Sequence, residues 1–138
     1  MDRARFARLV LGLGALLFLG LGSWFLIAPQ ALALVGLGAD SPAARTELRA
    51  TYGGFEVGVG LFLAWCAAGD LLRLRTGLVA CACALGGFGA GRLVGLVVDR
   101  PPQPVFLVLL AAELSGVALP VLALALLRAP GRPAADAA

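Results

Sequence analysis

Four long apolar segments constrain this chain more than any other feature of its sequence. Each has about the 20 residues that an α-helix needs to cross the hydrocarbon core of a bilayer. Charged residues make up only 14% of the 138 positions, whereas soluble domains carry roughly 25%. The sequence therefore predicts an all-α membrane protein, a bundle of four transmembrane helices. The expected spans are about residues 9–28, 50–69, 77–98 and 105–127.

The predicted spans form one domain. We expect a single four-helix membrane domain over residues 1–128, followed by a disordered tail over 129–138 that is rich in Ala and Pro and has no apolar pattern. The helix that contains the second span should begin before the bilayer, because Ser41 is a good N-cap residue and Pro42 suits the first helical position. The apolar run 31–38 is too short to span and is expected at the membrane interface.

The first segment also resembles a secretory signal peptide. Arg3, Arg5 and Arg8 precede its apolar run, and residues 31–33 resemble a cleavage site. The apolar run is, however, longer than the roughly 7–15 residues of a signal h-region. We therefore expect this segment to be a retained transmembrane helix.

The distribution of arginine predicts the orientation. The chain has no Lys, and seven of its eleven arginines fall on one side of the predicted membrane and three on the other. Because cytoplasmic loops carry an excess of basic residues, both termini are expected in the cytoplasm of a multi-pass protein of the bacterial inner membrane. Arginines that flank apolar runs give no indication of nucleic-acid binding. The seven are Arg3, Arg5, Arg8, Arg73, Arg75, Arg128 and Arg132, and the three are Arg45, Arg49 and Arg100.

Three ionisable side chains, Glu56, Arg92 and Glu113, lie inside the predicted spans. A charge at the bilayer centre costs roughly 3 kcal/mol on insertion scales, so such residues usually face the bundle interior or a wet cavity. At 1.5 Å per residue, each lies about 10–14 Å from the outer end of its helix. We therefore expect one outward-opening polar site, in which Arg92 pairs with Glu56, with Glu113 or with both.

Residues on the same helix faces extend this predicted site, because positions three, four or seven apart share a face. Two acids against Arg92 leave the charge unbalanced, and a protonated carboxyl, Arg49, a bound cation or a polar ligand group would each balance it. Glycines three or four residues from each charge leave room for a ligand, for water or for a neighbouring helix. The candidate ligand-binding residues are Arg49, Tyr52, Glu56, Arg92, Asp99 and Glu113.

Glycines also repeat at helical spacing. Gly87, Gly91 and Gly95 recur every fourth residue, as do Gly54 and Gly58. This pattern predicts faces at which helices approach closely. Such faces would pack within the bundle or between copies in a homo-oligomer.

No metal or cofactor is predicted. The chain has no His, and Cys66, Cys81 and Cys83 form no Cys-x-x-Cys pair, so the usual zinc ligands are missing. The glycine-rich run 86–91 lacks the Lys-Ser/Thr ending of a phosphate loop.

Several motifs together are similar to a known bacterial family. They are Glu47-Leu48-Arg49-Ala50, Tyr52-Gly53-Gly54, the Gly58–Phe62 stretch, Gly91-Arg92-Leu93-Val94-Gly95-Leu96 with Asp99, and Glu113 in the last apolar segment. These motifs resemble the family known as domain of unknown function 4345, over about residues 9–127. The resemblance implies a four-helix membrane protein and supplies no activity. The role of Glu56 rests on its depth in the membrane alone.

Three functions fit these residues. The first, which we favour because intramembrane ionisable residues are functional by default, is the binding of a small lipophilic or amphipathic molecule. The second is an intramembrane acid/base enzyme, an isomerase, cyclase or epoxide-opening enzyme on a lipophilic substrate, with Glu113 or Glu56 as the acid and Tyr52 or Arg92 polarising an oxygen. The third is a structural or accessory subunit, in which a buried Arg–Glu network only fixes helix register. Whether the protein is an enzyme stays open.

Overall fold

The computed structural model describes residues 2–101 and 103–128, and every regular element in these ranges is helical. The predicted all-α class is thereby confirmed. Along the chain the elements are α1 (Arg3–Ile27), the 3-10 helix η1 (Pro29–Val35), α2 (Pro42–Leu48), the π-helix η2 (Arg49–Gly54), α3 (Phe55–Ala67), α4 (Leu71–Val98) and α5 (Val105–Arg128).

Three of the described helices, α1, α4 and α5, are long and apolar enough to cross a membrane. Two of them begin six residues before the predicted spans, because aspartates cap their N-termini. The Asp2 carboxylate accepts a hydrogen bond from the N–H of Ala4, and the Asp70 carboxylate accepts one from Arg73. The predicted tail over 129–138 lies outside the described residues. By length and composition, α1, α4 and α5 are compatible with a small membrane protein.

The remaining helical segment is continuous from α2 through η2 to α3. It begins at Pro42 as predicted, and the Ser41 hydroxyl accepts a hydrogen bond from the N–H of Ala44 at 3.0 Å. The middle of the segment is π-helical from Arg49 to Gly54, a local widening that is rare and is often found at functional sites. α3 by itself has 13 residues, fewer than the roughly 20 of a spanning helix.

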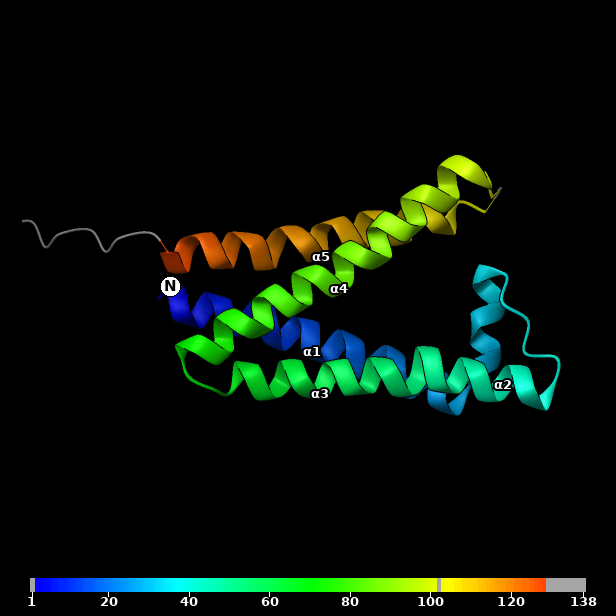
Figure 1. Cartoon of the computed structure of the whole chain (residues 1–138), viewed down its shortest axis with the longest axis horizontal. Helices are drawn as coiled ribbons and strands as arrows, with labels where there is room; N and C mark the ends of the chain where they lie inside the picture. Colours follow the sequence, from blue (N-terminus) through cyan, green and yellow to red (C-terminus); the bar gives the residue numbers. More distant parts are fainter. Residues whose placement is uncertain (1, 102, 129–138) are drawn as a thin grey trace, which may run out of the picture.

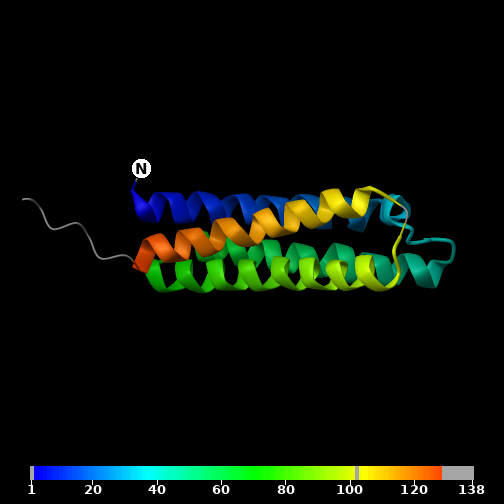
Figure 2. The same cartoon turned by 90° about the horizontal axis from the view of Figure 1, so that it is seen from above.

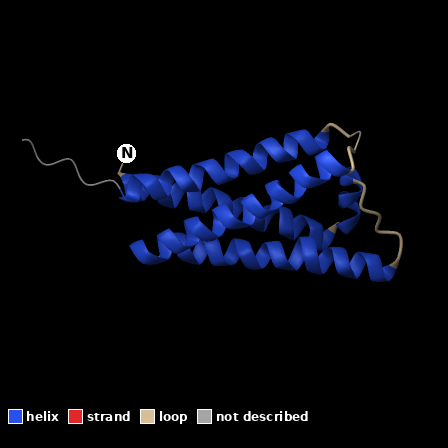
Figure 3. Cartoon of the chain, turned by 45° about the horizontal axis from the view of Figure 1, so that its top comes forward, coloured by secondary structure: helices blue, strands red, loops and turns tan. Residues whose placement is uncertain are grey.

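The helices pack as two pairs, α1 with α3 and α4 with α5 (Figure 1). The pairs lie together at the end that holds the N-terminus, and they diverge toward the other end, where η1 lies (Figures 1 and 3). Viewed from above, α1, α3, α4 and α5 run along one common bundle axis (Figure 2). The fully buried leucines concentrate toward the closed end of the bundle: Leu11, Leu63, Leu74 and Leu78. The end at which α3 and α4 lie farther apart is called the open end of the bundle (Figure 1).

Large apolar side chains cover the outside of the bundle. Ile27, Leu72 and Val98 are 80%, 73% and 71% exposed, and many other leucines and valines are exposed on every long helix. A soluble monomer rarely exposes contiguous apolar surface on this scale. The outer surface is thus suited to contact with lipid.

Candidate functional site

Arg92 of α4 and Glu113 of α5 form an ion pair between the two helices. The Arg92 Nε–H donates to both carboxylate oxygens of Glu113, at 3.0 and 2.9 Å, and Nη2 donates to Oε1 at 2.6 Å. Glu113 is only 8% exposed. Of the pairings that the sequence left open, the structure contains this one. Charge-assisted hydrogen bonds of this length are the strong kind.

The pair leaves part of the Arg92 guanidinium free. A guanidinium has five N–H donors, and Glu113 takes the one on Nε and one on Nη2. The two donors on Nη1 and the second on Nη2 have no protein partner among the described residues. The guanidinium carbon lies 5.9 Å from the ring centre of Phe106, which shields one side of it. Arg92 therefore keeps hydrogen-bonding capacity for a further group beyond the described residues.

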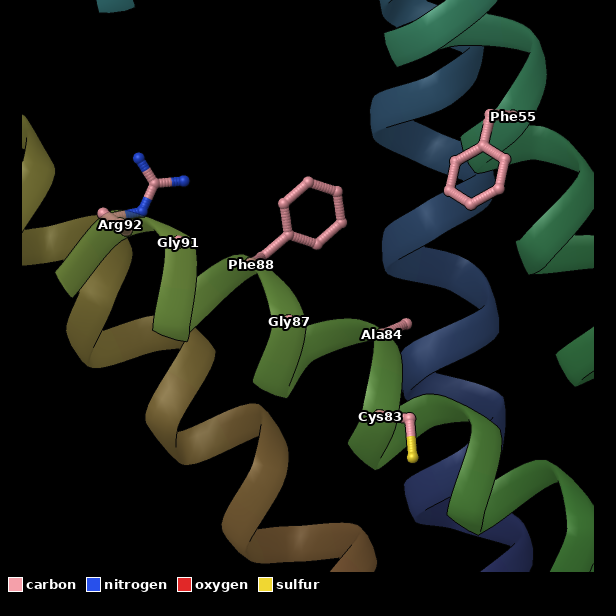
Figure 4. A pocket seen from close by; sticks show the side chains of 7 residues that line it. All are labelled: Phe55, Cys83, Ala84, Gly87, Phe88, Gly91 and Arg92. Carbon is pink, nitrogen blue, oxygen red and sulfur yellow. The ribbon is translucent and has the colours of Figure 1, made fainter. Parts of the chain in front are cut away.

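A groove of about 550 Å³ runs from Arg92 along α4 on the side that faces α3. Phe88 and Arg92 project from α4 to the same side, and Phe55 projects from α3 across the opening (Figure 4). Arg92 is the only charged side chain in the lining, at one end of the groove. The other lining residues are small or apolar: Cys83, Ala84, Gly87 and Gly91.

A second groove of about 240 Å³ lies on the other side of Arg92, between the C-terminal end of α4 and the N-terminal end of α5. Its lining includes Arg92, Gly95 and Asp99, which were predicted to share one helix face, and Phe106 of α5. Asp99 is exposed and makes no ion pair with Arg92. The second groove thus holds a free carboxylate, whereas the first has none in its lining.

Glu56 lies apart from this pair. It faces α1, and a Cβ placed on Gly22 of α1 would lie 2.9 Å from the Cβ of Glu56. Glu56 is 7% exposed, and its Oε2 is buried without a hydrogen-bond partner among the described residues. An unpaired carboxylate in such a place is costly, so the group requires a proton or a partner that comes from outside the described chain. Its neighbour Phe55, not Glu56, lines the groove.

Arg49 and Tyr52 also lie on the α1 side. Arg49 donates from Nε to the carbonyl of Leu26 at 2.9 Å and so caps the C-terminal end of α1. The ring of Tyr52 packs edge-on against Phe25 of α1, with 6.5 Å between ring centres. The six predicted site residues therefore form two groups: Arg92, Glu113 and Asp99 on α4 and α5, and Arg49, Tyr52 and Glu56 against α1.

Two other arginines cap helix ends in the same manner. Arg8 of α1 donates to the carbonyl of Ala67, the last residue of α3, and Arg75 of α4 donates to that of Leu127 at 3.1 Å. A cation near the C-terminus of a helix also interacts favourably with its dipole. Arginines that the sequence presents as topology signals thus also hold helix ends together.

The glycines divide into two classes. A Cβ on Gly22, Gly53 or Gly60 would lie within 2.7 Å of an atom of the facing helix, so these glycines allow α1 and α3 to approach closely. A Cβ on Gly87 or Gly91 would meet nothing within 4 Å. The prediction that Gly54, Gly58, Gly87, Gly91 and Gly95 let helices of the bundle approach closely is therefore wrong, because a Cβ on any of them would meet no other described helix within 4 Å. Gly87 and Gly91 instead leave the α4 wall of the groove bare.

The aromatic walls of the groove, Phe55 and Phe88, were not among the predicted site residues. Phe88 lies four residues before Arg92, so the two share a helix face, and this spacing was the signal available. Phe55 is adjacent to Glu56 but belongs to the neighbouring face, and only the packing of α3 beside α4 places it opposite Phe88. Among the described residues, no three His, Cys, Asp or Glu side chains are grouped to hold a metal ion.

Comparison with known proteins gives one match. The model of a family described as "Domain of unknown function (DUF4345)" matches residues 6–126. No curated protein and no solved structure matches the chain. The matched range contains α1 from residue 6 onward, both grooves and the Arg92–Glu113 pair.

Proposed function

The chain belongs to the DUF4345 family, which assigns no activity, and from this premise we propose that it is a membrane protein that binds a small lipophilic or amphipathic molecule. The molecule lies in the groove between α3 and α4, with its polar group at Arg92 and its apolar part along Phe88 toward Cys83. From residue 83 to 92 this path measures about 14 Å at 1.5 Å per residue.

The observation that carries the proposal is the position of Arg92. The guanidinium is anchored by Glu113, yet it lines a groove and keeps three N–H donors without a protein partner among the described residues. Ligand sites are typically apolar concavities in which a few fixed polar groups orient the ligand. A groove with aromatic walls and a single fixed guanidinium at one end has this character.

We propose that the continuous helix of α2, η2 and α3 is a fourth membrane span, beside α1, α4 and α5. Residues 50–67 extend about 27 Å at 1.5 Å per residue, close to the roughly 30 Å hydrocarbon thickness. Trp24, near the end of α1, and Trp65, near the end of α3, are about half exposed at opposite ends of the bundle. Tryptophan is enriched at both membrane interfaces, so the two rings support two interface levels.

The arginine count supports an inner-membrane orientation with both termini in the cytoplasm. The open end of the bundle and the Arg92 site then face outward. A reporter that is active only in the periplasm should be inactive when fused at Ala138 and active when inserted at Gly38. The opposite pattern would reverse the orientation.

Binding is tested by photo-crosslinking of the full chain in lipid nanodiscs. A photoreactive alkyl ester should form saturable adducts with the α4 segment from Cys83 to Arg92. Gly91→Leu fills the groove without a clash, because a Cβ there meets nothing within 4 Å, and should abolish these adducts. Gly58→Leu is the matched control, because Gly58 has the same free space and does not line the groove. Equal labelling of both variants would mean that the reagent samples only bulk lipid.

The acid/base enzyme has less support from the arrangement of its candidates. The carboxylate of Glu113 is held by Arg92, the ring of Tyr52 packs on α1, and Glu56 is not in the groove lining. A general acid must come within hydrogen-bond reach of the reacting group. We therefore favour binding.

A further inference from the structure

We propose that the molecule bound at Arg92 is electrically neutral and presents a hydrogen-bond acceptor of the carbonyl type, as an ester or ketone does. This inference rests on the proposed function and specifies its ligand. It follows from the charges that surround the free side of the guanidinium.

The charge of Arg92 is already neutralised within the protein. Glu113 contacts the guanidinium through three hydrogen bonds and is 8% exposed, so little water screens its negative charge. An anionic group that accepts hydrogen bonds from the free donors would be separated from this carboxylate only by the guanidinium itself. Two anions would then share one cation in a site of low dielectric constant, which is costly.

The carboxylate of Asp99 also disfavours an anionic ligand at Arg92. Asp99 lines the second groove with Arg92 and adds a further negative charge near the guanidinium. Within residues 2–101 and 103–128, no other basic side chain lines either groove. An added anion therefore has no second cation to pair with.

A cationic ligand is disfavoured for the opposite reason. The lining of the α3–α4 groove contains no carboxylate, and its only charged group is Arg92 itself. A cation there would meet like charge and no acceptor side chain. A neutral acceptor can take the free N–H donors of Arg92 without placing a new charge in the site.

The apolar part of the ligand is defined by the same lining. Phe88 and Phe55 flank the path along α4, and Gly87 and Gly91 leave its floor bare of side chains. Such a floor accepts a slender, extended chain. Together, the features select an alkyl chain that carries a neutral carbonyl group at one end.

The test compares two molecules with the same alkyl chain, one with a neutral head group that carries an added methyl and one with an anionic head group. Methyl dodecanoate and dodecanoate compete against the photoreactive ester for the full chain in nanodiscs, at a pH where the fatty acid is ionised in the bilayer. We expect the ester to compete with a Kd about tenfold lower or more. Equal affinities, or tighter binding of dodecanoate, would overturn the neutral-ligand inference and leave the groove as a binding site.

Changing the neutralising carboxylate should reverse the preference. Glu113→Gln keeps the shape and an acceptor oxygen and removes the negative charge, so Arg92 becomes a net cation at the groove. The ratio of the two affinities should shift toward dodecanoate by about tenfold or more. Glu47→Gln, an exposed position outside both groove linings, is the control and should leave the ratio unchanged. An unchanged ratio in a folded Glu113→Gln protein would refute the charge argument.

Two failures are thus distinguishable. If neither molecule competes for saturable labelling of the α4 segment, the proposed function fails. If both compete and the carboxylate is preferred, only the neutral-ligand inference fails. Should Glu113→Gln not fold, the comparison of the two molecules on the unaltered protein still decides.

Discussion

Replacing Arg92 by Leu should destabilise the protein more than replacing Glu113 by Leu. Arg92→Leu removes three hydrogen bonds and leaves the Glu113 carboxyl, 8% exposed, without its partner. Breaking a buried pair by removing one member typically costs about 3–5 kcal/mol. Because Glu113 is not completely buried, we expect a loss of about 3 kcal/mol, at the lower end of this range.

Glu113→Leu leaves a different residue unpaired. The Arg92 side chain is 20% exposed and lines two grooves, so its guanidinium can reach water or a lipid head group after the carboxylate is removed. We expect this variant to lose about 1–2 kcal/mol, the price of the lost charged hydrogen bonds. The double variant with Leu at both positions should be within about 1 kcal/mol of the unaltered protein, because apolar replacement of a buried pair is often neutral.

The assay is unfolding of the full chain in detergent, followed by helical circular dichroism for all four proteins. Arg5→Leu serves as the control for loss of an exposed arginine and should change stability little. If Arg92→Leu matches this control, Glu113 does not depend on Arg92. If the double variant loses the sum of both single effects, the two residues do not act as a pair.

Three further predictions concern the packing around α1. Gly22→Ala should lower the free energy of unfolding by about 1–3 kcal/mol, because the new Cβ would lie 2.7 Å from the backbone nitrogen of Val57. Gly20→Ala is the control and should be neutral or stabilising, because a Cβ there has free space. Equal unfolding midpoints of the two variants would contradict the close approach of the helices at Gly22. Glu56→Gln should leave the unfolding midpoint unchanged or raise it, since it removes an unpartnered buried acid; a clear loss of stability would reveal a partner for the carboxyl. Arg49→Gln should lower the free energy of unfolding by about 1 kcal/mol and speed amide hydrogen exchange at the C-terminal end of α1. Unchanged exchange there would rule out the cap that Arg49 makes on the carbonyl of Leu26.

The sequence was sufficient to predict the helices because their signals are local. Apolar length fixes the α4 and α5 segments, and Ser41 with Pro42 marks the start of the second helical segment. The N-terminal ends of α1 and α4, at Asp2 and Asp70, were not predicted, although an aspartate before a helix is itself a local cap signal. The π-helical turn between α2 and α3 has no comparable pattern in the sequence.

The site was only partly predictable, because its contacts depend on how the helices pair. Depth in the membrane identified Arg92 and Glu113 as candidates, but depth alone cannot distinguish Glu113 from Glu56 as the partner. That choice follows from α5 packing on α4 while Glu56 faces α1. Likewise the cap that Arg75 makes on α5 joins residues 52 positions apart, and nothing local in the sequence indicates it.

The most direct test of the account is an experimental structure of the full chain in nanodiscs that contain methyl dodecanoate. We predict elongated non-protein density along α4 from Cys83 to Arg92, between Phe55 and Phe88, with its polar end in hydrogen-bond range of Arg92 and the Glu113 contact intact. A structure in which α3 closes against α4 and fills the groove, or in which Arg92 turns away from it, would contradict the account.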